Sequence, residues 1–217
     1  MEKSRTSRDF RMSEAEGKEK QAIREYIRRR RQALSAQEKA LLDRAVLRQF
    51  SSALDEMTMR GPLPAVYCYA SIGGEPDTYA LIKHMRQRGI SVALPRVEGE
   101  KMRFYFVPDT DRLKAGYRGI MEPDETCKKA DIPGAPMIVP GAAFTPDGGR
   151  LGLGGGFYDR FLDMEPEHTR IAVCYPFQIF DELPMEAHDK WMDIVITGEH
   201  ILYGKRSEGK DGSRGWN

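Results

Sequence analysis

Residues 149–162, GRLGLGGGFYDRFL, contain five glycines. These glycines directly precede residues 157–162, FYDRFL, which are typical of a helix start. Glycine allows positive φ angles and lets a backbone come close to a ligand. The N-terminus of a helix adds unpaired N–H groups and a partial positive charge. Together these features predict a binding site for phosphate groups.

Two charged side chains in this segment support that prediction. Arg150 could grip two phosphate oxygens through its guanidinium, and Asp159 could hold a Mg²⁺ ion that bridges to the same phosphates. The alternative is a flexible surface turn, although such turns rarely carry Arg, Tyr and Asp so close to their glycines. The spacing fits neither a Walker A loop nor a G-x-G-x-x-G dinucleotide motif, because Phe157 stands where the last glycine would be. The segment therefore predicts phosphate binding without naming a cofactor.

The composition narrows the class of protein. The chain has 217 residues with 34 basic and 33 acidic side chains, a balance that argues against a dedicated nucleic-acid binder. We find no apolar run of the roughly 18 residues that a membrane helix needs, and no signal peptide. The three cysteines lack C-x-x-C spacing and fit reduced thiols. We expect a single-domain, monomeric, cytoplasmic protein that binds neither nucleic acid nor membrane.

Helical and strand patterns alternate along the chain. They predict an α/β fold, namely a single three-layer open, largely parallel sheet flanked by helices, with an N-terminal helical pair. We expect this domain to span residues 18–203, with disordered polar tails at 1–17 and 204–217. Helices are predicted at residues 19–34 and 77–89. Two more are predicted to begin at the capping box 35–38 and at residue 157. Strands are predicted at residues 65–70, 90–94, 102–107, 137–139, 170–174 and 194–197.

Three loops follow predicted strands, at residues 71–77, 141–156 and 175–180. In open α/β sheets, ligands bind beyond the carboxyl ends of the strands. We therefore expect these loops to converge on one site that includes the glycine-rich segment.

Several separated segments resemble the 5-formyltetrahydrofolate cyclo-ligase family, also called methenyltetrahydrofolate synthetases. The glycine segment with its Phe-Tyr-Asp-Arg continuation is the most specific of them, and the similarity extends over roughly residues 18–201. The matching segments are 20–24, 71–81 (SIGGEPDTYAL), 94–96, 119–123, 138–162 and 178–197.

The resemblance implies an ATP- and Mg²⁺-dependent conversion of 5-formyltetrahydrofolate to 5,10-methenyltetrahydrofolate, with ADP and phosphate as the other products. A formyl oxygen is a poor leaving group, so its phosphorylation would create an iminium phosphate that N10 attacks to close the ring. In phosphoryl transfer a protein mainly supplies positioning and charge neutralisation. A glycine loop, arginines, a lysine and a metal ion suit that task.

The resemblance also implies residue roles. Catalysis would fall to Arg150, Tyr158 and Asp159, and Mg²⁺ would be held by Asp159 and Asp193. Folate would contact Ile72, Glu75, Asp77 and Phe157. ATP would contact Lys20, Gln21, Arg24, Arg150, Leu151, Gly152, Leu153, Gly154, Gly155, Gly156, Phe157 and Tyr158.

Each role has a structural alternative. Lys20 and Arg24, one helical turn apart, could belong to a solvated face, and Asp77 could cap the following helix. Asp159 could be an acidic residue at a helix start, and Asp193 a carboxylate at a strand edge. The aromatic pair at 157–158 could pack in the core. The run of four arginines at 28–31 spreads around a helix, which favours a solvated face over a nucleic-acid stripe.

Other functions remain open from sequence. The enzyme could use ATP on another N-formyl or carboxyl compound, or be a sugar-phosphate isomerase or CoA-transferase-like enzyme of related fold, because fold does not fix function. A non-catalytic relative that binds folate or nucleic acid would be expected to have lost Arg150, Asp159 or glycines of the loop, and all are present.

Overall fold

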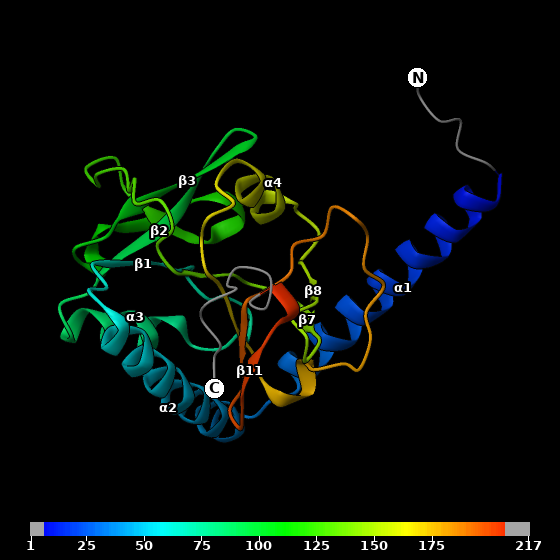
Figure 1. The fold of residues 1–217 in the computed structure, drawn as a ribbon, viewed down its shortest axis with the longest axis horizontal. Helices are drawn as coiled ribbons and strands as arrows, with labels where there is room; N and C mark the ends of the chain where they lie inside the picture. Colours follow the sequence, from blue (N-terminus) through cyan, green and yellow to red (C-terminus); the bar gives the residue numbers. More distant parts are fainter. Residues whose placement is uncertain (1–6, 207–217) are drawn as a thin grey trace.

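The computed structural model describes the chain from Ser7 to Arg206, and a central sheet of seven strands organises it (Figure 1). The strands lie in the order β11-β10-β9-β6-β1-β2-β3. Their bounds are β1 Ala65–Tyr67, β2 Ser91–Glu98, β3 Lys101–Phe106, β6 Met137–Ile138, β9 Arg170–Val173, β10 Ile194–Ile196 and β11 Ile201–Tyr203. The five inner strands run parallel, and the edge strands β3 and β11 pair antiparallel to them. The expected α/β fold with a largely parallel sheet is confirmed.

Four α-helices accompany the sheet within residues 7–206: α1 Ser7–Gln32, α2 Ala36–Arg60, α3 Thr78–Gln87 and α4 Phe157–Met164. The capping box at the start of α2 forms as predicted, with Ser35 and Glu38 bonding to each other's backbone N–H groups. Figure 1 shows the first turns of α1 extending away from the sheet and its later turns lying near β7 and β8.

Alternate residues of the inner strands point to opposite faces of the sheet, and each face carries its own apolar core. On one face, Val66 packs with Phe50 of α2 and Leu81 of α3. On the other, Tyr67 packs with Phe161 of α4. Strands buried on both faces read as continuous apolar runs, which is why the sequence marked them clearly.

Two small hairpins were not predicted. One joins β4 (Leu113–Ala115) to β5 (Met121–Pro123), and the other joins β7 (Ala143–Phe144) to β8 (Arg150–Leu151). The second strand of this hairpin, β8, contains Arg150 and Leu151 near the start of the glycine-rich segment. It therefore fixes where that segment leaves the body of the protein.

Ordered contacts extend beyond the expected limits of 18 and 203 at both ends of the described chain. Residues 7–17, expected to be disordered, belong to α1, which begins at Ser7. At the other end Gly204 donates its N–H to the Asp193 carbonyl at 2.8 Å, and Lys205 pairs with Asp147. Residues 1–6 and 207–217 lie outside the described part of the chain.

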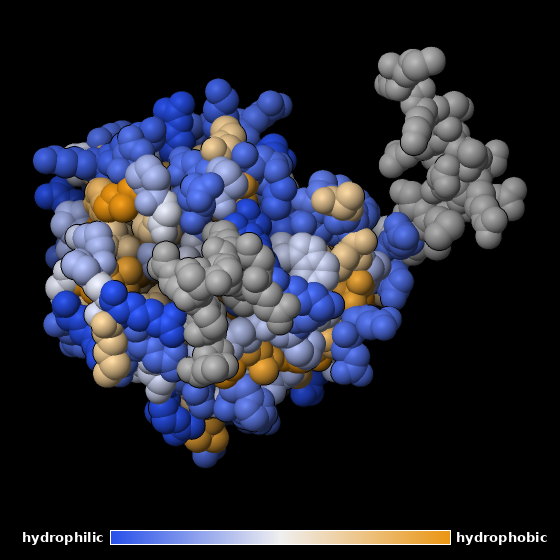
Figure 2. Space-filling model, in the orientation of Figure 1, coloured by the Kyte–Doolittle hydropathy of each residue, from blue (hydrophilic) through white to orange (hydrophobic). Residues whose placement is uncertain are grey.

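The surface in view is mainly hydrophilic, with small separate hydrophobic areas (Figure 2). Within residues 7–206, no helix combines the length and apolar character needed to cross a membrane.

The order of the strands places a switch point between β1 and β6. The chain moves from β1 to its neighbour β2 through α3, and β6 lies on the opposite side of β1. When the loops after two neighbouring parallel strands lead away in opposite directions, a crevice opens at the carboxyl ends of those strands. The loops after β1 and β6 are those that carry Glu75 and the glycine segment.

Candidate functional site

A cavity of about 230 Å³ lies at this switch point. The loop after β1, the glycine segment, the start of α4 and the β4–β5 hairpin form its walls. Most of the predicted site residues line it: Ile72, Glu75, Arg150, Gly152, Leu153, Gly155, Gly156, Phe157, Tyr158 and Asp159. The structure therefore gathers the predicted phosphate and folate residues around one space.

The glycine segment adopts a backbone that needs glycine. Gly154 has φ 96° and Gly156 has φ 65°, both in the left-handed region. Gly156 is the N-cap of α4, and no side chain caps the helix there. The first N–H groups of the eight-residue helix are thus free of side-chain capping at the cavity wall. Leu151, in contrast, is buried in β8 and does not line the cavity.

Arg150 is a buried cation at the edge of the cavity. Its side chain is 3% exposed, and Nη1 donates to Asp159 Oδ1 at 3.1 Å. Burial lowers the pKa of Arg150, while the charge of Asp159 opposes that change. Its Nε has no hydrogen-bond partner. Buried polar groups are normally bonded, so this donor has capacity for an anion.

Two aromatic residues follow the loop. The Phe157 ring meets the Tyr117 ring edge to face, with 5.3 Å between centroids. The hydroxyl of Tyr158 is buried without a partner, and burial raises its pKa well above the usual value. Tyr158 therefore stays neutral and can donate a hydrogen bond to a ligand.

Helix α1 approaches the glycine segment from outside the cavity. Arg24 Nε donates to the Gly152 carbonyl at 2.9 Å, so Arg24 supports the loop. Lys20 Nζ pairs with Asp189 at 2.8 Å and Glu186 at 3.1 Å. Burial acts to lower the pKa of Lys20, but these two partners outweigh it and raise the pKa. Gln21 is exposed on the same helix.

The loop after β1 presents a buried carboxylate. Glu75 accepts the Ile72 N–H at 3.0 Å and lies 3.5 Å from Arg31. Burial raises the pKa of Glu75, and the Ile72 N–H and Arg31 partly oppose that rise. Asp77, by contrast, caps α3 by accepting two N–H groups of its first turn and does not line the cavity.

The sequence led us to expect that the arginine run 28–31 forms a solvated face. The structure shows that this holds for only part of the run. Arg28 and Arg29 pair with Glu25 on the surface, whereas Arg31 is buried against Glu75. A run of identical residues on a helix gives no sign of which member faces the body. Sequence reasoning therefore missed Arg31.

The two carboxylates expected to share Mg²⁺ lie apart. Asp159 lines the cavity, while Asp193 precedes β10 at the amino-terminal end of the parallel strands. Asp193 Oδ2 accepts the Arg170 N–H at 2.7 Å and pairs with Arg206. Within the described residues, no three His, Cys, Asp or Glu side chains cluster as a metal site.

Gln178 and the β4–β5 hairpin also shape the site. Gln178 is buried and donates to the Ala142 carbonyl at 2.9 Å, fixing the loop after β6. Arg118 lines the cavity with φ 53°, an uncommon conformation for a residue with a side chain. No local motif marks either residue, because their roles arise from tertiary packing.

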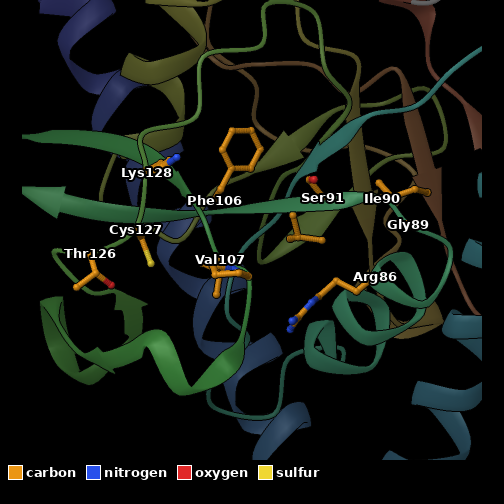
Figure 3. A pocket seen from close by; sticks show the side chains of 11 residues that line it. Arg86, Gly89, Ile90, Ser91, Phe106, Val107, Thr126, Cys127 and Lys128 are labelled. Carbon is orange, nitrogen blue, oxygen red and sulfur yellow. The ribbon is translucent and has the colours of Figure 1, made fainter.

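A second cavity of about 530 Å³ lies at the other end of β2 and β3 (Figure 3). Arg86 of α3, Val107 and Cys127 are among the residues around it, and none of the predicted site residues is. We place the site in the smaller cavity, because convergent polar groups mark a functional pocket better than volume does.

Comparisons with known proteins identify the family of the chain. Residues 16–198 match the 5-formyltetrahydrofolate cyclo-ligase family. The chain is 33% identical to a 5-formyltetrahydrofolate cyclo-ligase of Mycolicibacterium smegmatis over 155 residues, which are 65% of this chain and 77% of that protein. It is 27% identical to the enzyme of that name from Haemophilus influenzae over 191 residues, 82% of this chain and 97% of that protein.

A solved structure extends the likeness to three dimensions. The structure of Aquifex aeolicus 5,10-methenyltetrahydrofolate synthetase superimposes with a TM-score of 0.75 at 31% identity, covering 91% of this chain and 96% of the other. Sequence and fold therefore lead to one assignment. The chain is an enzyme of the 5-formyltetrahydrofolate cyclo-ligase family.

Proposed function

We infer that this enzyme uses ATP and Mg²⁺ to convert 5-formyltetrahydrofolate into 5,10-methenyltetrahydrofolate, with release of ADP and phosphate. Family membership supports the reaction. The observation that carries the assignment of the site is the convergence of two loops on one cavity. Glu75 comes from the loop after β1, and the glycine segment with Arg150 and Asp159 comes after β6.

The folate head fits the side of the cavity that holds Glu75. A carboxylate can accept two parallel N–H bonds from the guanidine-like edge of a pterin. Glu75 is 5% exposed, so such bonds would form in a site largely shielded from water. The rings of Phe157 and Tyr117 offer apolar faces to the pterin or the aminobenzoyl group.

The triphosphate fits the glycine segment. Its positive-φ glycines bring backbone N–H groups close to a ligand, and the start of α4 adds a partial positive charge. The free Nε of Arg150 adds a donor with full charge. Lys20, Gln21 and Arg24 lie on the helix that supports this segment, and we assign them to the ATP side.

The residues present fit one Mg²⁺ ion at Asp159. Mg²⁺ retains several waters and takes one or two carboxylates together with phosphate oxygens, so a single carboxylate is sufficient. The Asp159 side chain is 24% exposed and faces the cavity. When bound, the ion supplies charge neutralisation to the phosphates. Asp193 is engaged by Arg170 and Arg206, so we assign it a structural role.

The chemistry then follows from position. The formyl oxygen attacks the γ-phosphorus, and the bond to ADP breaks. The resulting iminium phosphate is attacked at carbon by N10, which loses its proton, and phosphate departs with the former formyl oxygen. Arg150 stabilises the charge that develops on the phosphoryl group, and the neutral Tyr158 hydroxyl donates a hydrogen bond to it.

The test is a spectrophotometric assay with purified protein, 5-formyltetrahydrofolate, Mg²⁺ and ATP. We expect the near-ultraviolet band of the methenyl product to grow only when ATP is present. If ATP raises the melting temperature but no band appears, the nucleotide site stands and the substrate is a different N-formyl or carboxyl compound. Without either signal, the assignment of the cavity fails.

A further inference from the structure

Arg31 links the two loops that form the active-site cavity. It lies in the last turns of α1, and its side chain is 8% exposed. Nη2 donates to the Gly141 carbonyl at 3.0 Å, in the loop after β6. Nη1 lies 3.5 Å from Oε1 of Glu75, in the loop after β1. One guanidinium therefore spans the switch point of the sheet.

The backbone around Glu75 is built against Arg31. Gly74 has φ 79°, and a Cβ atom there would lie 3.1 Å from both Cβ and the carbonyl oxygen of Arg31. The second carboxylate oxygen of Glu75 accepts the Ile72 N–H at 3.0 Å. The carboxylate is thus fixed by one backbone donor and one cation.

The groups that face Glu75 give its charge little other support. The phenols of Tyr69 and Tyr158 stay neutral, since burial raises both of their pKa values well above the usual range. Tyr175 donates to the Glu75 backbone carbonyl rather than to its carboxylate. Arg150 and Glu122, of opposite charge, line the same cavity. Among the described residues, Arg31 is the cation that forms an ion pair with Glu75.

We propose that Arg31 is a positioning residue for the folate substrate, which holds the Glu75 carboxylate charged and oriented for the pterin edge. This inference rests on the proposed function, in which Glu75 binds the pterin. A buried carboxylate without a partner is strongly disfavoured, so removal of Arg31 would lead Glu75 to take up a proton or turn away. Either change removes an acceptor that the pterin needs.

The experiment compares Arg31→Gln and Arg31→Lys with Arg29→Gln, whose side chain is exposed and pairs with Glu25. Steady-state kinetics measure KM for each substrate and kcat. We expect Arg31→Gln to raise the KM for 5-formyltetrahydrofolate about ten- to a hundredfold, the value of one charged hydrogen bond. The KM for ATP changes much less, and Arg29→Gln resembles the wild type.

The pH profile separates positioning from a general loss of structure. Without Arg31, burial raises the pKa of Glu75 further, so the acid limb of kcat/KM for the folate moves to higher pH. Arg31→Lys restores a positive charge and returns the limb toward its wild-type position. If Arg31→Gln does not fold, Arg31→Lys still tests the proposal. Because it keeps a positive charge beside Glu75, we expect its KM for the folate to stay within a few-fold of the wild-type value.

A double-mutant cycle gives the decisive comparison. Because Arg31 acts through Glu75, the variant Glu75→Gln/Arg31→Gln should bind folate no worse than Glu75→Gln alone. Additive losses, or an Arg31→Gln enzyme with wild-type KM for folate, overturn the inference while leaving the proposed function intact. Absence of turnover in the wild-type enzyme overturns the proposed function instead.

Discussion

At the scale of single residues, Asp159 allows a direct test of the metal assignment. Asp159→Asn keeps an oxygen that can accept from Arg150 Nη1 but removes the negative charge that Mg²⁺ needs. We expect turnover to fall by about two orders of magnitude or more, with little change in melting temperature. Asp163→Asn, one turn later on α4 and 63% exposed, is the matched control. Equal activity of the two variants would remove Asp159 from the site.

The unpartnered hydroxyl of Tyr158 leads to a second expectation. Because it makes no hydrogen bond within the protein, Tyr158→Phe should leave the free energy of unfolding unchanged or raise it by about 1 kcal/mol. At the same time kcat should drop about tenfold, since the ligand loses a donor. Tyr175→Phe provides the contrast, because its hydroxyl donates to Asp43 and the Glu75 carbonyl. Denaturant unfolding and steady-state assays measure both; a destabilised, fully active Tyr158→Phe would contradict this role.

At the scale of elements, the sequence predicted those with strong local signals. The capping box of α2, the Asp77 cap of α3 and the buried inner strands all form as expected. Strand β11 and the hairpins β4–β5 and β7–β8 have strands of two or three residues, too short for periodicity to show. Each of these strands pairs antiparallel with a neighbour only a few residues away in the chain.

The candidate site divides in the same way. The glycine segment predicts phosphate binding through its local chemistry, and the sequence alone suggests Arg150 and Asp159 as candidates there, both of which line the cavity. Arg31 could not, because its importance comes from a contact with Glu75 across 44 positions in the chain. Asp193 shows the converse: its residue type matches the family, but the sequence did not reveal that it lies at the amino-terminal end of β10, away from the cavity.

The glycine segment as an element supports a third prediction. Gly154 has φ 96°, and a Cβ atom there would meet nothing closer than 3.9 Å, so Gly154→Ala strains the backbone without a clash. We expect a loss of about 1–2 kcal/mol in stability and about a tenfold rise in the KM for ATP. Gly89→Ala is the control, because Gly89 also has a positive φ of 75° and open space but follows the end of α3, outside the glycine segment. It should lose similar stability and keep its KM; equal KM values for both variants would exclude the segment from ATP binding.

At the scale of the whole molecule, α1 spans both halves of the site. Arg24 contacts the glycine segment, Lys20 pairs with Asp189, and Arg31 lies toward Glu75. These positions follow one stripe of the helix together with the buried Ile27. A single helix therefore contacts both the glycine segment and the loop of Glu75, to which we assign the phosphates and the folate.

The three free cysteines report on the integrity of this whole arrangement. Cys68 and Cys174 follow inner strands and belong to the cores on opposite faces of the sheet. Burial raises the pKa of Cys68 to about 12 and also raises that of Cys174, so neither forms the reactive thiolate at neutral pH. Cys127 is 8% exposed beside the second cavity.

Iodoacetamide should therefore modify Cys127 first, and should reach Cys68 and Cys174 only when the fold opens globally. Saturating MgATP stabilises the native state; at 100 times its dissociation constant it should slow modification of the two core thiols about a hundredfold, because that excess corresponds to about 2.7 kcal/mol. The rate at Cys127 should change far less, since local opening suffices there. Peptide mapping by mass spectrometry measures all three rates in one sample. Modification of Cys68 as fast as Cys127 would mean that the core between α2 and the sheet opens independently of the nucleotide side.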